Sequence, residues 1–228
     1  LLIVLRAGLN RAFRDPDNGI LGDVAWRRVE RFEDVDAAKV RYLSGEECTR
    51  LINASGPAFR SLVQAALLTG ARYGELIAMN CDDYNADSGT VAVYESKSGE
   101  PRRIPLNDEG VLLFSQLTAG RKGKIFLKTN GEPWGRWQQA RPLADAAGAA
   151  KVEDVTFHIL RHTYGSNLAM QGVPMSVIAN VLGHSSTRMT EKHYAHLSTS
   201  YVAETIRANL PKLGIVDPGN VTTLRHGG

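Results

Sequence analysis

Five short segments of this 228-residue chain bring together arginine, histidine, lysine and tyrosine, residue types that could act on a phosphate ester. Arginine supplies planar, permanently charged donors for two phosphate oxygens. Histidine can move a proton or donate a hydrogen bond, and a hydroxyl can attack as a nucleophile. The five segments are TGARYGEL (69–76), SKSGEPRRIPL (96–106), HILRHTYG (158–165), LGHSS (182–186) and EKHYAH (191–196).

The segment HILRHTYG contains a histidine and an arginine three residues apart. On a helix His158 and Arg161 project from one face, so they can converge on one phosphate. The histidine could accept a proton from an attacking hydroxyl, and the arginine could stabilise charge that builds on phosphorus. An alternative is that His158 and His162, four residues apart, are zinc ligands. No H-E-x-x-H pattern and no acidic or cysteine cluster completes such a site, so we favour phosphate chemistry.

Two further basic residues have ordinary explanations when taken singly. Arg72 and Glu75, at i and i+3 of a predicted helix, could be a surface ion pair. Lys97 lies on a predicted hairpin turn beside Arg102 and Arg103, and a solvated turn lysine is the simplest interpretation. If Lys97 donates a proton, neighbouring cations must lower its pKa from the usual value of about 10.4.

The chain contains seven tyrosines that compete for the role of nucleophile. A tyrosine taken at random packs far more often than it reacts, because a phenol with a pKa of about 10 is a weak nucleophile. Tyr194 is selected by its position after the arginine and histidine segments. Tyr164, inside HILRHTYG, suits packing, and Tyr201 begins the next predicted helix.

The elements that must position these residues are mainly helices. A capping-box pattern from Ser44 to Glu47, followed by Leu51 and Ile52, predicts a helix that ends at Gly56-Pro57. Two β-prone runs, 90–95 and 101–106, flank a loop with a glycine and predict a hairpin. Apolar spacing further predicts a helix that ends near 68, helices at 1–13, 72–79, 109–118, 136–148, 157–171, 174–182 and 198–209, and a brief strand at 125–127.

The composition is that of a globular protein, with 43% hydrophobic and 22% charged residues. No apolar run reaches the length of a membrane span, so we expect a soluble protein of the cytoplasm. The net charge of +3, with the basic excess in the C-terminal half, is compatible with a polyanionic partner. Cys48 and Cys81 lack C-x-x-C spacing, which favours buried thiols in a reducing compartment.

In their joint order, the five segments resemble the catalytic domain of tyrosine recombinases of the phage-integrase type, over residues 40–210. Any single segment would occur by chance, and the order makes the match specific. The resemblance implies a mainly α fold with a small antiparallel β-sheet (α+β). It also implies site-specific DNA strand exchange by transesterification through a 3′-phosphotyrosine intermediate, with no metal or nucleotide cofactor.

The resemblance assigns a role to each candidate residue. Four side chains would bind the scissile phosphate and stabilise its charge: Arg72, His158, Arg161 and His184. Glu75 would orient the first arginine, Lys97 would protonate the leaving 5′ oxygen, and Tyr194 would be the nucleophile. The segment between the last histidine and the tyrosine is one residue longer than in the commonest form of the family.

The family also implies a domain arrangement. Residues 14–24 are rich in Asp, Gly, Pro and Asn, which is typical of a linker. We predict the end of a truncated N-terminal core-binding domain with its linker at 1–24, a linker at 25–39, a catalytic domain at 40–215 and a tail at 216–228. Because the chain opens inside a predicted helix without an initiator Met, we expect a fragment of a longer protein.

The expected partners are double-stranded DNA and further recombinase subunits. The family implies a tetramer at the bacterial nucleoid, with the helix after Tyr194 docked on a neighbouring subunit; the same helix could equally pack on its own domain. Three alternatives stay open: a type IB topoisomerase-like enzyme, a non-catalytic DNA-binding protein, and a metal-dependent nuclease. The nuclease would need clustered acidic or histidine ligands that the sequence lacks.

Overall fold

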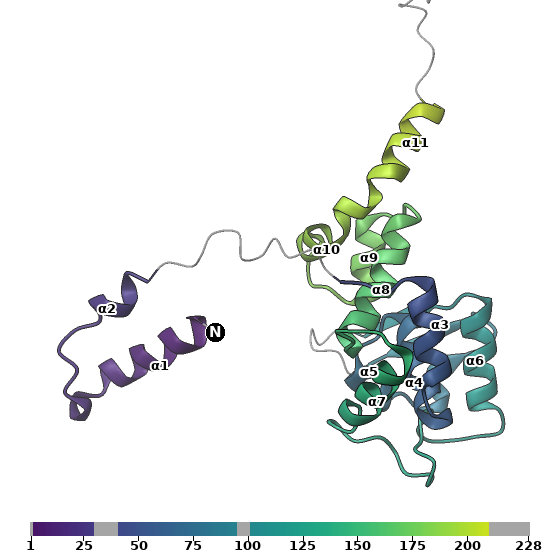
Figure 1. Ribbon diagram of the computed structural model, residues 1–228, viewed down its shortest axis with the longest axis horizontal. Coiled ribbons are helices and arrows are strands. Elements are labelled where there is room, and N and C mark those ends of the chain that lie inside the picture. The colour runs from purple at the N-terminus through teal and green to yellow at the C-terminus, as the bar shows by residue number, and fades with distance from the viewer. Residues whose placement is uncertain (1, 30–40, 95–100, 210–228) are drawn as a thin grey trace, which may run out of the picture. The chain divides into compact units, whose positions relative to one another are not determined.

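The computed structural model describes residues 2–29, 41–94 and 101–209. Its contacts divide the chain into two units, Leu1–Lys39 and Val40–Gly228 (Figure 1). The first unit contains helix α1 (Leu2–Arg14), a 3₁₀ turn (Pro16–Asn18) and the short helix α2 (Val24–Arg27).

Aromatic packing joins the two helices of the first unit. The rings of Phe13 and Trp26 meet edge to face, with centroids 6.1 Å apart. The indole N–H of Trp26 donates to the side-chain oxygen of Asn10 at 2.8 Å. The predicted N-terminal helix is confirmed, whereas the predicted linker segments contain the turn and α2.

The second unit is mainly helical, as predicted. Helix α3 begins at the predicted capping box, because the Ser44 hydroxyl accepts from the backbone N–H of Glu47 and the Glu47 carboxylate accepts from the backbone N–H of Ser44 at 2.8 Å. Helices α4 and α8 lie against each other near the centre of the unit. The helices before residue 151 are α3 (Gly45–Ala54), α4 (Pro57–Thr69), α5 (Tyr73–Ala78), α6 (Asp108–Thr118) and α7 (Ala140–Ala150).

A three-stranded antiparallel sheet lies between α5 and α6 in the sequence. Its strands, in the order β1-β2-β3, are β1 (Tyr84–Asn85), β2 (Thr90–Val93) and β3 (Arg102–Pro105). Val91 pairs with Ile104 and Val93 pairs with Arg102, so the predicted hairpin is confirmed. Residues 95–100 lie outside the described residues, and the predicted position of Lys97 on the hairpin loop lies there with them.

The C-terminal part of the second unit is a group of helices that carries most of the predicted site. It comprises α8 (Phe157–Met170), α9 (Met175–Leu182), α10 (Thr187–Tyr194), a 3₁₀ turn (Ala195–Ser198) and α11 (Thr199–Asn209). Helix α11 extends away from α8 and α9 (Figure 1). The sequence did not predict α10, because its residues TRMTEKHY are mostly polar.

Two clusters of buried side chains form the core of the second unit. The larger cluster joins α3, α4 and α5 to the sheet, to α6 and to the start of α8. The smaller one consists of Ala169, Ile178, Leu182 and Tyr194, from α8, α9 and α10. The candidate nucleophile is therefore a core residue of the C-terminal helices.

Three expectations about local structure were wrong. Residues 125–127 do not form a β-strand. Ile125 and Phe126 are buried in the core, but the backbone pairing here is limited to isolated bridges such as that of Leu127 with Pro133. Helix α7 begins at Ala140 rather than at 136, since turns occupy 136–139. Cys81 is buried as expected, but Cys48 is only half-buried.

None of the helices in the described part of the chain combines the length and the apolar character that a membrane span requires.

Candidate active site

A cleft of about 480 Å³ opens where α8 meets the start of α5 and the turn between α9 and α10. It brings together four of the six predicted catalytic residues. The residues that line it are Arg72, His158, Arg161, His162, Gly183, His184, Ser185, Met189 and His193. Two arginines and four histidines from separate segments therefore face one space.

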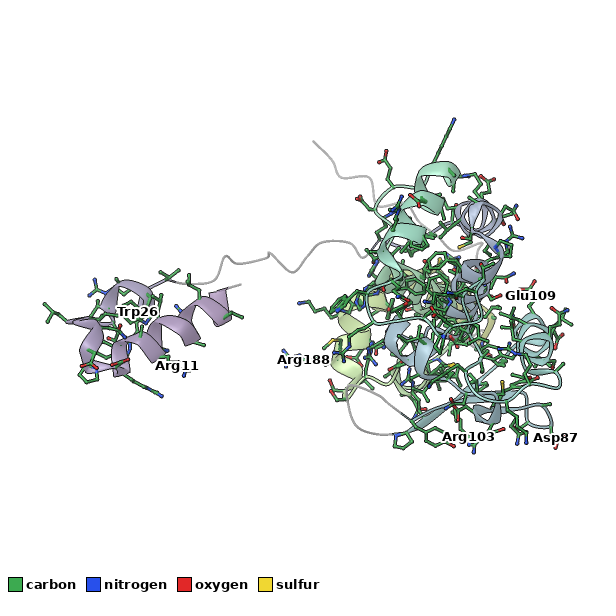
Figure 2. All side chains as sticks on the ribbon, turned by 90° about the horizontal axis from the view of Figure 1, so that it is seen from below. Arg11, Trp26, Asp87, Arg103, Glu109 and Arg188 are labelled. Atoms are coloured by element: carbon green, nitrogen blue, oxygen red, sulfur yellow. The ribbon has the colours of Figure 1, made fainter. Side chains whose placement is uncertain are left out.

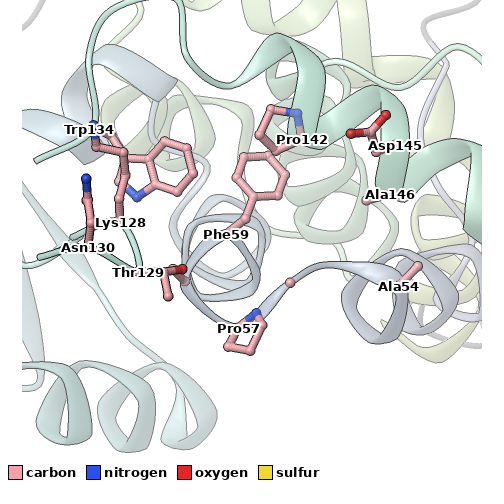
Figure 3. A pocket seen from close by; sticks show the side chains of 12 residues that line it. Ala54, Pro57, Phe59, Lys128, Thr129, Asn130, Trp134, Pro142, Asp145 and Ala146 are labelled. Carbon is pink, nitrogen blue, oxygen red and sulfur yellow. The ribbon is translucent and has the colours of Figure 1, made fainter. Parts of the chain in front are cut away.

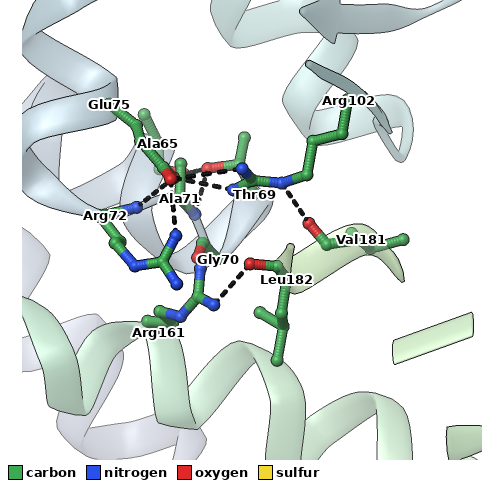
Figure 4. A network of polar contacts seen from close by, with 10 residues as sticks. All are labelled: Ala65, Thr69, Gly70, Ala71, Arg72, Glu75, Arg102, Arg161, Val181 and Leu182. Carbon is green, nitrogen blue, oxygen red and sulfur yellow. Dashed lines mark hydrogen bonds and ion pairs between the residues drawn. The ribbon is translucent and has the colours of Figure 1, made fainter. Parts of the chain in front are cut away.

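Arg72 precedes the first turn of α5 and is held there by Glu75. The Glu75 carboxylate accepts from the backbone N–H of Arg72 at 2.9 Å and from its guanidinium at 2.7 Å (Figure 4). The Arg72 side chain keeps 31% exposure, whereas the Glu75 side chain keeps 3%. The carboxylate thus fixes the direction of a guanidinium that stays accessible from the cleft.

Glu75 also binds a second arginine, which sequence reasoning did not assign to the site. Arg102 on β3 donates to the Glu75 carboxylate at 2.7 Å and 3.2 Å. Burial raises the pKa of Glu75, but the hydrogen bonds and charges of Arg102 and Arg72 outweigh it and hold that pKa below its usual value. Glu75 is therefore an anion at neutral pH, shared between two cations.

Arg102 joins three elements at this point. Its Nε–H donates to the carbonyl of Val181 at the end of α9 at 2.8 Å, and its side chain keeps only 6% exposure. Its neighbour Arg103 is exposed, at the periphery of the unit (Figure 2). The signal was available in the sequence: strand alternation puts residue 102 on the same face as the apolar Ile104.

Arg161 is buried on α8, with 2% exposure. Its guanidinium donates to the carbonyl of Gly70 at 2.9 Å and to the carbonyl of Leu182, which are the ends of α4 and α9 (Figure 4). Burial, followed by the charge of Arg72, lowers the pKa of Arg161 to about 10, so it stays charged at neutral pH. The side chain both ties the helix ends together and puts a cation at the base of the cleft.

His158 and His184 face the cleft from opposite elements. His158 is exposed on the first turn of α8, as the spacing predicted. Partial desolvation, and then the charges of Arg161 and Arg72, lower the pKa of His158 below its usual value. At neutral pH its imidazole is therefore neutral, and it can both accept and donate a hydrogen bond.

His184 follows Gly183, which ends α9 in the left-handed conformation, with φ of 66°. The predicted end of this helix at residue 182 is confirmed. The imidazole of His184 is half-buried, and its Nδ1 lies 2.7 Å from the Thr190 hydroxyl of α10. Burial, and then the charge of Arg161, lower the pKa of His184 to about 4.

Tyr194 is the last residue of α10 and is 1% exposed. Its hydroxyl lies 2.8 Å from Nδ1 of His162, and it does not line the cleft. Burial raises the pKa of Tyr194 to about 12, although the positive charge of Arg161 acts in the opposite direction. The sequence had suggested a tyrosine directly beside the phosphate-binding residues; in the structure His162 lies between its hydroxyl and the cleft.

His162 was considered in the sequence only as a zinc ligand. Its ring centroid is 4.5 Å from that of His158, and the two rings are nearly perpendicular. Among the residues that the structure describes, no group of three or more His, Cys, Asp or Glu side chains could hold a metal ion. Burial, followed by the charge of His158, lowers the pKa of His162 to about 4, so its ring is a neutral partner for the phenol.

A second hollow, of about 560 Å³, lies on another part of the unit. Phe59, Trp134 and Pro142 are among its apolar lining residues (Figure 3). It shares no residue with the cationic cleft, and its lining charges are only Lys128 and Asp145. None of the residues selected from the sequence lines this second hollow.

The fold and the cleft define the class of this domain: mainly helical, with a small antiparallel sheet and a site built from arginines and histidines. The model of the Phage integrase family matches residues 41–200. The chain belongs to this family.

Curated relatives are similar over most of the second unit. The integrase of Salmonella phage P22 is 28% identical over 182 residues, covering 74% of this chain and 47% of the relative. The tyrosine recombinase XerC of Pelobacter propionicus is 27% identical over 165 residues, covering 70% and 54%. The chain thus spans about half the length of these two relatives. The type 1 fimbriae regulatory protein FimE of Escherichia coli is 29% identical over 187 residues, covering 76% of this chain and 94% of the relative.

Solved structures show the same fold. XerA recombinase matches with a TM-score of 0.63 and 25% identity, covering 75% of this chain and 66% of that one. The catalytic domain of bacteriophage HP1 integrase matches with a TM-score of 0.59 and 26% identity, covering 75% and 95%. The predicted fold class, a tyrosine-recombinase-like catalytic domain, is confirmed.

Proposed function

We propose that this chain is the catalytic part of a site-specific DNA recombinase that breaks and rejoins strands by transesterification with Tyr194. The observation that carries the proposal is the convergence of Arg72, His158, Arg161 and His184 on one cleft, with the tyrosine hydroxyl directly behind its wall. Family membership and recombinase relatives support the same activity.

The proposed reaction is a phosphoryl transfer in which the phosphotyrosine ester conserves the energy of the broken phosphodiester bond. The Tyr194 oxygen attacks a DNA phosphorus, the bond from phosphorus to the 5′ oxygen breaks, and a 3′-phosphotyrosine forms. The phenol loses its proton to a base, and the leaving 5′ oxygen takes one from an acid. A 5′ hydroxyl of a partner strand then attacks the phosphotyrosine, and the phenol is regenerated.

The cationic charge of the site comes from arginine. The lowered pKa values of His158 and His184 keep these two side chains neutral at pH 7, so Arg72 and Arg161 supply the charge that stabilises the phosphorane. His158 and His184 are proposed as hydrogen-bond partners of the phosphate oxygens. His158 is also suited to accept the phenol proton, because it is neutral and exposed.

Several parts of the proposal rest on family resemblance. Lys97 remains the proposed acid for the 5′ oxygen. The proposed domains remain a core-binding remnant with linker at 1–24, a linker at 25–39, a catalytic domain at 40–215 and a tail at 216–228. No metal or nucleotide cofactor is required by the proposed steps.

Double-stranded DNA is the proposed substrate, and a tetramer on DNA the proposed assembly, at the nucleoid of a bacterial cytoplasm. Solved integrase and recombinase complexes with DNA share the fold. The proposed trans docking of α11 is supported by its exposed apolar side chains, Val202 and Ile206. A largely apolar groove of about 610 Å³, lined by Leu168 and Val177 among others, offers a surface for such a helix.

A type IB topoisomerase-like activity would use the same covalent chemistry, and a decayed DNA-binding protein would lack it. The complete set of arginine, histidine and tyrosine side chains favours an active enzyme. Neither alternative has an observation of its own in its favour.

One assay tests the nucleophile directly. The 228-residue chain is incubated with a nicked suicide DNA substrate at low salt, and SDS-stable protein–DNA adducts are measured. We expect an adduct with the wild-type chain, none with Tyr194→Phe, and wild-type amounts with the control Tyr94→Phe, whose side chain is exposed. EDTA should leave adduct formation unchanged.

An adduct that forms equally well with Tyr194→Phe would exclude this tyrosine as the nucleophile. Strand cleavage that requires a divalent metal would instead support the nuclease alternative. A relaxation assay on supercoiled DNA, compared with strand exchange between two cognate sites, separates a topoisomerase from a recombinase.

A further inference from the structure

His184 is held twice, through its backbone by the end of α9 and through its imidazole by α10. Its backbone N–H donates to the carbonyl of Ala179 at 2.9 Å, which fixes the turn after α9. Its ring nitrogen Nδ1 lies 2.7 Å from the hydroxyl of Thr190, six residues further along the chain. Thr190 is 0% exposed, so water does not compete for this hydrogen bond.

The hydroxyl of Thr190 differs in its partner from those of other helical threonines. In other helices, four threonines donate the hydroxyl hydrogen to the carbonyl four residues earlier: Thr49, Thr69, Thr118 and Thr163. Among the residues that the structure describes, the partner found for the Thr190 hydroxyl is Nδ1 of His184. A buried hydroxyl hydrogen needs an acceptor, so we expect it to point at this nitrogen.

The direction of this bond decides which nitrogen of the imidazole carries a hydrogen. A neutral imidazole has one donor and one acceptor nitrogen. If Nδ1 accepts from Thr190, the hydrogen of the ring is on Nε2, and Nε2 is a donor. Because His184 lines the cleft and its Nδ1 is engaged, Nε2 is the nitrogen that remains for a phosphate oxygen. The opposite tautomer would present a lone pair to an anionic oxygen.

The surroundings of the ring keep it neutral. Burial, and then the charge of Arg161, lower the pKa of His184 to about 4. Three further basic side chains act in the same direction: Arg72, His193 and Arg102. A doubly protonated ring would donate from both nitrogens whatever its neighbours. At neutral pH the ring has a single hydrogen, so its position matters.

We propose that Thr190 is a positioning residue that holds His184 as the Nε2–H tautomer, so that a neutral imidazole donates to a non-bridging oxygen of the scissile phosphate. This inference rests on the proposed function of the cleft in binding that phosphate. Motif spacing selects His184 but not Thr190, whose role depends on the packing of α10 against α9.

Paired substitutions at Thr190 separate the hydroxyl from the shape of the side chain. Thr190→Val keeps the branched shape and removes the hydroxyl, whereas Thr190→Ser keeps the hydroxyl and removes the methyl group. Thr118→Val is the matched control, because it removes a hydroxyl that donates within α6, and Thr118 does not line the cleft. His184→Leu provides a background without the imidazole.

Two readouts are measured on the full chain. The first is ¹⁵N NMR of histidine-labelled protein without DNA, in which protonated and unprotonated ring nitrogens have well-separated shifts. The signals that disappear in His184→Leu identify His184. The second is the single-turnover rate of covalent adduct formation on the nicked suicide substrate, at saturating DNA and neutral pH.

We expect the wild-type ring of His184 to carry its hydrogen on Nε2. Thr190→Val should change these ¹⁵N signals and slow adduct formation about 10-fold, as expected for the loss of one hydrogen bond. Thr190→Ser should stay close to wild type in both readouts, and Thr118→Val should leave both unchanged. In the His184→Leu background, Thr190→Val should cause no further loss of rate, because Thr190 acts through the imidazole.

The inference is overturned if the wild-type hydrogen is on Nδ1, or if folded Thr190→Val forms the adduct at the wild-type rate. An equal loss of rate in the His184→Leu background would also contradict it, since the effect would then not pass through the imidazole. Should Thr190→Val not fold, Thr190→Ala replaces it in both readouts. If the wild-type chain forms no adduct, the proposed function fails, while the ¹⁵N signals without DNA still test the tautomer.

Discussion

At the residue scale, the two site arginines differ in what holds them. Arg161 is buried and donates to the carbonyl groups of two helix ends, so its removal would disturb the fold as well as the cleft. Arg72 is held mainly by Glu75 and keeps 31% exposure. Arg72 is therefore the better position at which to separate chemistry from stability.

Replacing Arg72 by lysine should slow adduct formation about 10²- to 10³-fold, the effect typical of losing one preorganised donor. Lysine keeps the charge but loses the planar fork that can bind two phosphate oxygens. Single-turnover cleavage measures the rate, and urea unfolding measures stability, which should change little because Glu75 keeps Arg102 as a partner. A rate within threefold of wild type would show that Arg72 does not contact the reacting phosphate.

The histidines predict how stability depends on pH. His162 and His184 have pKa values of about 4 in the folded chain and about 6.5 when unfolded. Above pH 6.5 both are neutral in either state. Below it the unfolded chain binds protons that the folded chain does not, so the free energy of unfolding falls as the pH drops towards 4.

Between pH 7 and pH 5, each of these histidines should cost about 1–2 kcal/mol of stability. Urea unfolding at a series of pH values measures this loss. His184→Gln should flatten the pH dependence, since glutamine does not titrate. A free energy of unfolding that stays constant down to pH 5 would contradict the low pKa values.

At the scale of elements, Arg102 and Glu75 connect β3, α5 and the end of α9. Through Arg102, strand β3 is hydrogen-bonded to the end of α9, two residues before the turn that carries His184. Removing Arg102 leaves the buried Glu75 carboxylate with the partly exposed Arg72 as its remaining arginine partner, and it leaves the Val181 carbonyl without its donor, which is unfavourable.

Arg102→Leu should therefore lower the free energy of unfolding by about 1–3 kcal/mol. The matched control is Arg103→Leu on the same strand, which is exposed and should change stability by less than about 0.5 kcal/mol. Denaturant unfolding compares the two variants. Equal effects of the two substitutions would mean that the ion pair with Glu75 contributes no more than a surface charge.

At the scale of the whole molecule, the chain consists of two units with their own internal contacts. Deleting residues 1–39 should leave the main unfolding transition of the remaining chain unchanged, within about 0.5 kcal/mol. Urea unfolding followed by circular dichroism measures it. A clear loss of stability on deletion would mean that the first unit supports the fold of the second.

The sequence determined the parts of the site that depend on short-range geometry. The spacing of His158 and Arg161 requires a common helix face, and the capping box at Ser44 requires a helix start; both are found. Gly183 ends α9 because it tolerates a left-handed backbone. Local periodicity and backbone preferences are encoded within a few neighbouring residues, so they can be recognised in the amino-acid sequence without a structure.

How those residues meet depends on contacts between elements that lie far apart in the sequence. Arg102 became a site residue because burial paired it with Glu75, which lies on another element. Helix α10 is mostly polar, and contacts with α8 and α9 hold it in place. Tyr194 could be chosen from seven tyrosines by its motif, but its position against His162 and Gly165 depends on long-range packing, which the order of residues along the chain does not reveal.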